Sequence, residues 1–383
     1  MHRGMRVRPG IQAAVIGGLA AALWGGVYLA FESAFAGRYG WLWYDEAVYL
    51  GLSHEAWLAV GAYRPPLVWS LLKIIGGGGF QVVNLLAVGV MAGALYVGGR
   101  RLGGWRVGLL CAAVPLTVPA FWKYTPRFMP EAIALAAVAL GLSAIPVRRF
   151  WLAGAALGVG ALGRPELAVL GALSLVALPT RHRAWALTAL TMAVVILPFT
   201  IRNAVASRRF VPISANAGTN LWLGNLRERW LEPEVLERKY PQEVAALRAV
   251  PHEVDRDRLR LRFFVREVRR RPGRVWELWR YKAEHFWFGN SYWGHPTSIG
   301  VMMRVYVAFG CLGVVLGLTR RRLRLSAALA AGVVLFVWAV AIAVFPMERH
   351  RLLILPGIAV ATGLCPVALR EVIAAGRQET REV

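Results

Sequence analysis

Charged residues are scarce in this sequence of 383 residues, and acidic residues are the scarcest of them. They make up 17% of the chain, against roughly a quarter of a typical soluble domain. The 45 Lys and Arg outnumber the 21 Asp and Glu, which gives a net charge of +24. In a soluble protein that charge would indicate nucleic-acid binding. Because 57% of the chain is hydrophobic, we attribute much of it to loops between membrane spans and expect no nucleic-acid partner.

Cysteine is also rare, and the motifs of several enzyme classes are missing. Cys111, Cys311 and Cys365 all fall in apolar segments without metal-ligand spacing, so the sequence predicts neither disulfides nor a cysteine metal site. There is no glycine-rich nucleotide loop, so neither ATP nor a cytosolic sugar nucleotide is implied. We therefore expect no metal and no cofactor. Tandem repeats and low-complexity linkers are missing too.

Long charge-free apolar stretches recur along the whole chain. A bilayer-spanning helix needs about 20 mostly apolar residues, and shorter stretches suffice if flanking arginines reach the interface. The sequence therefore predicts an all-α polytopic membrane protein with about ten transmembrane helices. No cleavable signal peptide is evident, so we expect the first helix to be retained. The expected spans are residues 11–31, 80–99, 105–123, 130–147, 150–163, 165–180, 183–201, 299–319, 325–346 and 351–369.

Arginine-rich loops indicate which end of each span faces the cytoplasm. Arg3, Arg6 and Arg8 precede the first span, and short Arg-rich loops lie at 100–106, 148–149, 181–183 and 320–324. All can be cytoplasmic together only if the chain between the first two spans lies outside as one block. Residues 65–75 then form a helix on the outer interface, because about 11 residues are too few to cross. The alternative, a span at 65–77, puts four Arg clusters outside.

This topology divides the chain into three parts in an inner or plasma membrane. Residues 1–201 are expected to form a transmembrane module whose first outer loop, 32–79, carries the candidate catalytic acids described next. Residues 202–298 form an extracytoplasmic loop, and residues 299–383 form the last spans and a short cytoplasmic tail. Both termini are expected in the cytoplasm.

Acidic residues beside apolar segments are candidate catalytic groups, because charges near hydrocarbon are costly. Asp45 and Glu46 stand in WLWYDEAVYL (41–50), at the start of an expected amphipathic helix over 44–61. They are either capping residues at the positive helix end or a general base whose pKa is raised by desolvation. Glu131, after Pro130, is either a cap or a second carboxylate that faces Asp45.

Basic residues on the same predicted side are candidate phosphate contacts, since guanidinium binds phosphate oxygens in pairs. Arg64 precedes two prolines in YRPPL, and Arg349, His350 and Arg351 crowd one turn in FPMERHRLLILP. Arg164 and Glu166 flank Pro165, where they either pair with each other or contact substrate.

Two further segments lie in the expected outer loop of residues 202–298. Asn220, Trp222 and Asn225 combine amides with an aromatic ring, which suits either sugar binding or an ordinary structured loop. Residues 255–288 are basic and aromatic, and Pro272 divides them into two expected amphipathic helices on anionic lipid.

The order of these motifs resembles the GT-C integral-membrane glycosyltransferases, in particular the protein O-mannosyltransferase and aminoarabinose transferase branch. Asp45, Glu46 and Tyr49 are similar to that family's acidic pair in its first outer loop. RPPL, RPE and RHRLLILP are similar to three of its later motifs, and IRN…NLW.GN to a segment common in bacterial members. His350 departs from the pattern, because the family has an aromatic there.

The resemblance implies a polyprenyl-phosphate sugar donor and inverting transfer at the outer face to a glycan, lipid or protein hydroxyl. Asp45 would be the base, with Glu46 and Glu131 orienting hydroxyls, and Arg64, Arg349, His350 and Arg351 would bind the donor phosphate. Substrate contacts would come from Tyr49, Arg164, Glu166, Asn220, Trp222 and Asn225. The alternatives are a transporter or flippase of lipid-linked saccharide, which would place polar or broken helices at mid-membrane depth, and a scaffold subunit of an envelope complex.

Overall fold

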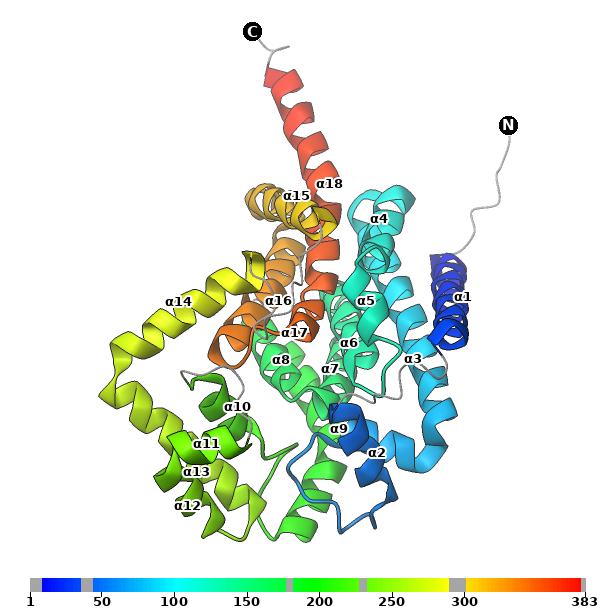
Figure 1. The fold of residues 1–383 in the computed structure, drawn as a ribbon. Coiled ribbons are helices and arrows are strands. Elements are labelled where there is room, and N and C mark those ends of the chain that lie inside the picture. Colours follow the sequence, from blue (N-terminus) through cyan, green and yellow to red (C-terminus); the bar gives the residue numbers. More distant parts are fainter. Residues whose placement is uncertain (1–8, 36–43, 177–181, 227–232, 289–300, 380–383) are drawn as a thin grey trace.

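The computed structural model of the chain describes residues 9–35, 44–176, 182–226, 233–288 and 301–379. Within these ranges all regular structure is helical and no strand occurs (Figure 1). Six described helices are long and apolar enough to cross a bilayer, so the chain is an all-α protein of multi-pass membrane type. Five of them are α1 (Pro9–Phe35), α3 (Pro66–Gly103), α9 (His182–Ser207), α15 (Val301–Thr319) and α16 (Arg324–Ala343). The sixth combines α17 (Glu348–Leu352) with α18 (Leu355–Glu379).

Shorter helices occupy the other four expected spans. They are α4 (Trp105–Leu116), α5 (Pro119–Tyr124), α6 (Glu131–Ala144) with the 3₁₀ turn η1 (Ile145–Val147), α7 (Phe150–Gly163) and α8 (Glu166–Val176). At about 1.5 Å per residue, a 14-residue helix such as α7 rises roughly 21 Å, less than the ~30 Å hydrocarbon core. The expectation of one continuous helix over 105–123 was wrong. Pro119 disfavours the helical conformation at the residue before it, and Val118 is extended.

The expected helix before the second span is present, and only a kink separates it from that span. Helix α3 starts at Pro66 and ends at Gly103, and it changes direction at Gly76 (Figure 1). Gly76 has φ 66° and ψ 180°, a backbone conformation that is accessible almost only to glycine. Residues 66–75 are therefore a helical segment distinct from the one that follows.

The loops expected outside carry the remaining helices, which are α2 (Tyr44–His54), α10 (Ala217–Gly224), α11 (Pro233–Lys239), α12 (Pro241–Arg248), α13 (Glu253–Arg270) and α14 (Pro272–Phe288). The break before Pro272 is confirmed. Helix α2 ends at His54, earlier than the expected helix over 44–61. The carbonyls of Trp57, Val60 and Gly61 accept hydrogen bonds from the buried Arg202 instead of continuing that helix.

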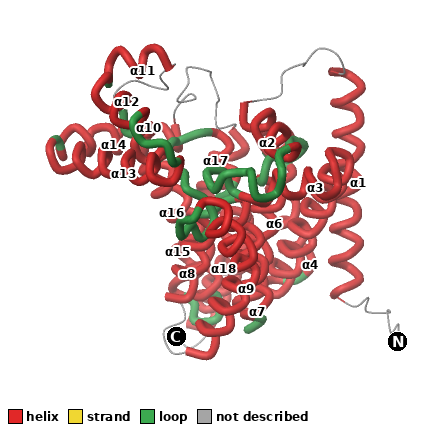
Figure 2. The backbone as a smooth tube through the Cα atoms, turned by 90° about the horizontal axis from the view of Figure 1, so that it is seen from below, coloured by secondary structure: helices red, strands yellow, loops and turns green. Residues whose placement is uncertain are grey.

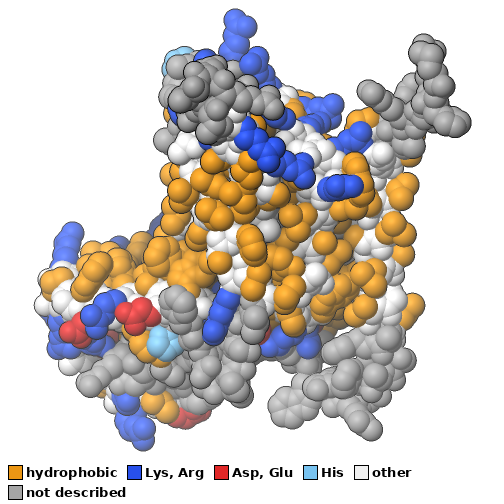
Figure 3. Space-filling model, turned by 90° about the horizontal axis from the view of Figure 1, so that it is seen from above, with side chains coloured by type: hydrophobic (Ala, Val, Ile, Leu, Met, Phe, Trp, Pro, Cys, Tyr) orange, Lys and Arg blue, Asp and Glu red, His pale blue; other side chains and the backbone are white. Residues whose placement is uncertain are grey.

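The two ends of the helix bundle differ in what they carry. Figure 2 shows the start of α1 at one end, which we call the terminal end, and α2 and α10–α14 at the other. The Arg-rich loops meet at the terminal end, where Arg322 Nη2 donates to the carbonyl of Leu102 at 3.3 Å and Nη1 lies 3.9 Å from Glu371. In Figure 3 a broad apolar band separates the basic side chains at that end from mixed acids and bases at the opposite end. Two of the loops that were predicted to share a side, 100–106 and 320–324, are therefore in contact.

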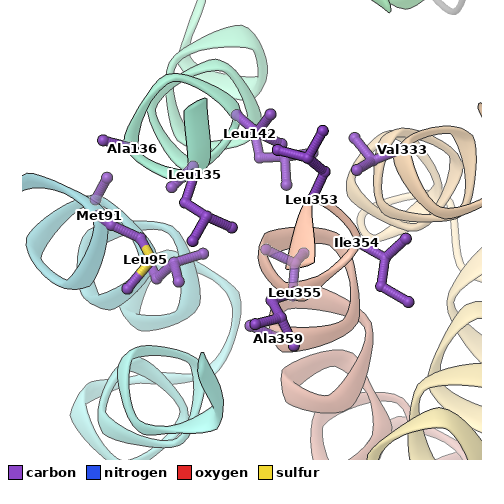
Figure 4. Packing of buried hydrophobic residues seen from close by; sticks show 14 of the residues in the cluster. Met91, Leu95, Leu135, Ala136, Leu142, Val333, Leu353, Ile354, Leu355 and Ala359 are labelled. Carbon is purple, nitrogen blue, oxygen red and sulfur yellow. The ribbon is translucent and has the colours of Figure 1, made fainter. Parts of the chain in front are cut away.

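The core lies where α3, α6, α16 and α18 meet. Figure 4 shows Met91, Leu135, Val333 and Leu355 converging from these four helices. Helix α1 lies at the edge of the bundle and packs on α3 (Figure 1). A Cβ on Gly17 would lie 2.6 Å from the carbonyl oxygen of Gly89, so only glycine allows α1 and α3 to approach so closely there.

Candidate active site

The carboxylate of Asp45 lies at the centre of a cluster of charges at the end of the bundle opposite the termini. Its Oδ1 accepts a hydrogen bond from Arg64 Nη1 at 2.8 Å, and its Oδ2 accepts one from Arg349 Nη1. Arg349 is 304 residues away in sequence, on α17. The side chains of all three residues are about four-fifths buried, with exposures of 17%, 20% and 22%. One carboxylate therefore joins α2, the turn before α3 and the turn before α18.

The surroundings of Asp45 act on its pKa in opposite directions. Burial raises the pKa, but the guanidinium groups of Arg349 and Arg64 more than offset this and hold it below the usual value. Asp45 is therefore ionised at neutral pH. Tyr49, one helical turn further along α2, is buried beside Arg64, and burial raises the pKa of its phenol to about 12. The phenol remains protonated and can donate a hydrogen bond.

Glu46 is buried and faces a different segment from its neighbour Asp45. Its Oε2 accepts from Arg127 Nη1, and its Oε1 accepts from the backbone N–H of Phe128, both at 3.1 Å. These bonds attach the start of α2 to the turn between α5 and α6. Arg127 was not among the sequence-predicted site residues, although it lies only four residues before Glu131.

Glu131 is completely buried at the start of α6, where Pro130 precedes the helix as expected. Its Oε1 accepts a hydrogen bond from Arg164 Nη2, and Arg164 Nη1 lies 3.6 Å from Glu166 Oε1. The pairing of Arg164 with Glu166 was one of the two expectations for that turn. Glu131 Oε2 has no hydrogen-bond partner among the described residues. The charge of Glu131 also attracts Arg349, so the Glu131–Arg164 pair lies next to the Asp45 cluster.

Helix α17 supplies the cluster with Arg349. Of its neighbours, His350 lies within electrostatic reach of Arg164, Arg349 and Asp45, whereas Arg351 is directed elsewhere. His350 Nδ1 donates to the carbonyl of Phe345 at 2.7 Å. Arg351 Nη2 donates to the carbonyl of His285 on α14 at 2.7 Å, and its guanidinium lies over the Phe286 ring. The expectation that Arg351 belongs to a phosphate clamp therefore does not fit its position, because its side chain attaches the turn to α14.

Three further residues beside Arg349 were not predicted. Glu348 Oε2 accepts hydrogen bonds from Lys123 Nζ at 2.7 Å and from the Tyr124 hydroxyl at 3.1 Å. These bonds hold α17 against α5 and so help to position Arg349. The only sequence signal was the proximity of Glu348 to the RHR turn, which does not identify a partner 225 residues away.

The three residues expected in the sugar-binding segment do not join the Asp45 cluster. Trp222 packs in a separate apolar cluster with Leu247 and Phe263. Asn225 is buried and donates to the carbonyl of Ala343, while its Oδ1 accepts from Trp279 and Lys282. Asn220 lies on α10, half-buried. In the structure, Trp222 and Asn225 stabilise the loop that is centred on α10, α13 and α14.

The Asp45 cluster combines two chemical capabilities. Its arginines are suited to bind a phosphate in pairs, and its ionised carboxylate can accept a proton. Within the described residues, no group of three or more His, Cys, Asp or Glu side chains is arranged to hold a metal ion. The sequence of the chain matches no protein-family model, and it matches no curated protein.

Proposed function

We propose that this protein is a glycosyltransferase that moves a sugar from a polyprenyl-phosphate donor to an acceptor hydroxyl at the outer face of the membrane. The observation that carries the proposal is the position of Asp45 between Arg64 and Arg349. A proton acceptor and two phosphate-binding groups meet at one end of an apolar helix bundle, where a lipid-linked donor would present its phosphate. The resemblance of the motifs to GT-C enzymes supports the same reaction.

The pairing of Asp45 suggests how donor binding prepares the site. Each carboxylate oxygen accepts a hydrogen bond from a guanidinium group, and these bonds make Asp45 a weaker proton acceptor for a bound hydroxyl. A donor phosphate offers the arginines a competing anion with more acceptor oxygens. Once the phosphate takes them over, Asp45 keeps the burial that raises its pKa and loses the two cations that lower it. The donor would thus convert a weak base into a stronger one.

The transfer step follows from these positions. Asp45 takes the proton of the acceptor hydroxyl, whose oxygen attacks the anomeric carbon with inversion. The bond between that carbon and the phosphate oxygen breaks, and polyprenyl phosphate leaves with the electron pair. Arg64 and Arg349 stabilise its negative charge, so the proposal needs no metal. Glu46 and Glu131 would orient hydroxyl groups, with Tyr49, Arg164 and Glu166 lining the site.

The proposal also includes an orientation in the membrane. The chain would cross an inner or plasma membrane ten times, with both termini in the cytoplasm and the Asp45 cluster outside. The gathering of the described Arg-rich loops at the terminal end supports this, because basic loops favour the cytoplasm. The acceptor would be a glycan, lipid or protein hydroxyl. In this arrangement α10–α14 would lie at the outer surface.

Sugar transfer in detergent tests the proposal directly. The purified chain is incubated with a radiolabelled polyprenyl-phosphate sugar and an envelope extract, and labelled product is counted. Asp45→Asn should lower the rate about 10²–10⁴-fold while donor binding is kept, because Asp45 no longer competes with the phosphate for the two arginines. Arg64→Gln and Arg349→Gln should instead weaken donor binding. Arg209→Gln is the matched control, since Arg209 pairs with Asp255 outside the cluster. Wild-type turnover in Asp45→Asn would refute the assignment.

The same assay separates the enzyme from a transporter or flippase of lipid-linked saccharide. A transporter needs two compartments and forms no new glycosidic bond, whereas the enzyme yields labelled product in detergent. Mass spectrometry of envelope glycans and glycoproteins, from cells with and without the protein, would then identify the sugar and the acceptor.

A further inference from the structure

A groove at the other end of the molecule is separate from the Asp45 cluster. It has a volume of about 460 Å³, within the usual range for ligand pockets. Its lining comes from α1, α3, the α6–η1 segment and the start of α7. Helix α1 packs on α3 but not closely on α6 or α7, so a space remains between α1 and these two helices. The groove is this space.

The apolar part of the groove has the dimensions of a lipid chain. Small residues such as Gly18 on α1 and Gly93 on α3 line it, and the wall on α1 runs from Ala13 to Ala21. Nine helical residues rise about 13 Å, close to one leaflet of a hydrocarbon core roughly 30 Å thick. The groove therefore fits an acyl chain from the leaflet on the terminal side.

Two arginines line the same groove at its end nearest the termini. Arg101 comes from the last turn of α3, and Arg149 directly precedes α7. They are close enough for their charges to repel. Of its five N–H donors, Arg101 uses Nη1 for the carbonyl of Ser143 at 3.3 Å. Among the described residues neither arginine has a carboxylate within 4.0 Å.

This lack of acids distinguishes the groove from the Asp45 cluster. There, Arg64, Arg127, Arg164 and Arg349 are each paired with a carboxylate. At the groove, two like charges face an apolar channel without a described counter-charge. Their electrostatic complement is an anion that carries a hydrocarbon chain, and basic pockets between transmembrane helices are typical sites for anionic lipid headgroups.

We infer that the groove binds one anionic phospholipid, with its phosphate on Arg101 and Arg149 and an acyl chain along α1 and α3. The bound lipid fills the space between α1 and α6 and so adds contacts between them. This site is independent of the glycosyltransferase proposal, because it lies in the opposite leaflet and uses none of the same residues.

Lipid titration of the full-length chain in a nonionic detergent tests the inference. Native mass spectrometry measures binding of phosphatidylglycerol and of phosphatidylcholine, which has a phosphate but no net charge. The wild type should bind phosphatidylglycerol at least tenfold more tightly. The double variant Arg101→Gln/Arg149→Gln should lose that preference. Arg183→Gln/Arg321→Gln removes the same charge from exposed arginines outside the groove and should keep it.

A second pair of variants tests the groove itself, whatever happens to the charges. A Cβ on Gly18 meets nothing within 4 Å, so Gly18→Leu fills the groove without a clash and should weaken phosphatidylglycerol binding at least tenfold. Gly26→Leu is the matched control, because Gly26 also lies in open space on α1 but outside the groove. Equal binding by wild type and Gly18→Leu would overturn the inference. Tighter binding of a polyprenyl phosphate than of phosphatidylglycerol at this site would overturn the assigned occupant.

Discussion

Asp45→Asn should destabilise the protein more than the loss of either arginine that pairs with it. The substitution keeps the shape of the side chain but leaves Arg64 and Arg349 close together without their shared counter-charge. Breaking a buried ion pair from one side costs about 3–5 kcal/mol, and breaking an exposed pair about 0–1 kcal/mol. Since the cluster is about four-fifths buried, we expect a loss of roughly 3 kcal/mol.

Substituting either arginine should destabilise the protein less than Asp45→Asn does, and the effects of the two arginine substitutions should not be independent. In Arg64→Gln the carboxylate still pairs with Arg349, and in Arg349→Gln it still pairs with Arg64. Each single change should therefore cost about 1 kcal/mol, whereas the double arginine variant should cost more than the sum of the two. The reason is that only the double variant leaves a buried carboxylate without a cation.

Equilibrium unfolding in lipid nanodiscs of fixed composition measures these free energies, with donor lipid absent so that ligand binding does not contribute. Asp255→Asn is the matched control, because Asp255 also lies between two arginines, Arg209 and Arg258, but its side chain is 32% exposed, against 17% for Asp45. Water screens that group, so its loss should change stability far less.

Two results would refute this reasoning. If Asp45→Asn is as stable as the wild type, the ion pairs do not hold α2 to α17. If the effects of the two arginine substitutions are additive, the carboxylate is not shared between them.

Three further predictions concern pH and buried contacts. Burial raises the pKa of Asp45 but Arg349 and Arg64 hold it below its usual value, so its stabilisation should be complete above about pH 4 and be lost as pH falls further; acid melting curves should show a smaller loss in Asp45→Asn. Burial lowers the pKa of Lys282 to about 7, so between about pH 7 and 10 the unfolded chain binds more protons than the folded one. Stability should therefore rise over this range, and pH-dependent unfolding of Lys282→Met should show no such rise. Arg202→Met leaves the carbonyls of Trp57 and Val60 without their donor; hydrogen exchange over residues 55–61 should accelerate at least tenfold, whereas unchanged protection would contradict this role.

Local chemistry was sufficient to predict much of the fold. Apolar stretches gave the helices, and Pro66, Pro130 and Pro272 marked where helical segments begin or separate. The breaks at Val118 and after His54 were not predicted. The first has a local cause, Pro119, which the apolar run over 105–123 masked. The second depends on hydrogen bonds from a distant arginine and has no local signal.

The sequence by itself determined which residues are apolar, where basic loops gather, and which short motifs place acids and arginines at helix ends. Those features depend on neighbours along the chain. Only the tertiary structure decided that Asp45 meets Arg349, that Arg351 attaches to α14, and that Trp222 packs in an apolar cluster. In the membrane-spanning part, helices that are apolar on all sides carry no periodic signal for which neighbour each face will contact. Ion pairs, in contrast, form between residues as far apart in sequence as Asp45 and Arg349, so their partners are settled only when the helices pack.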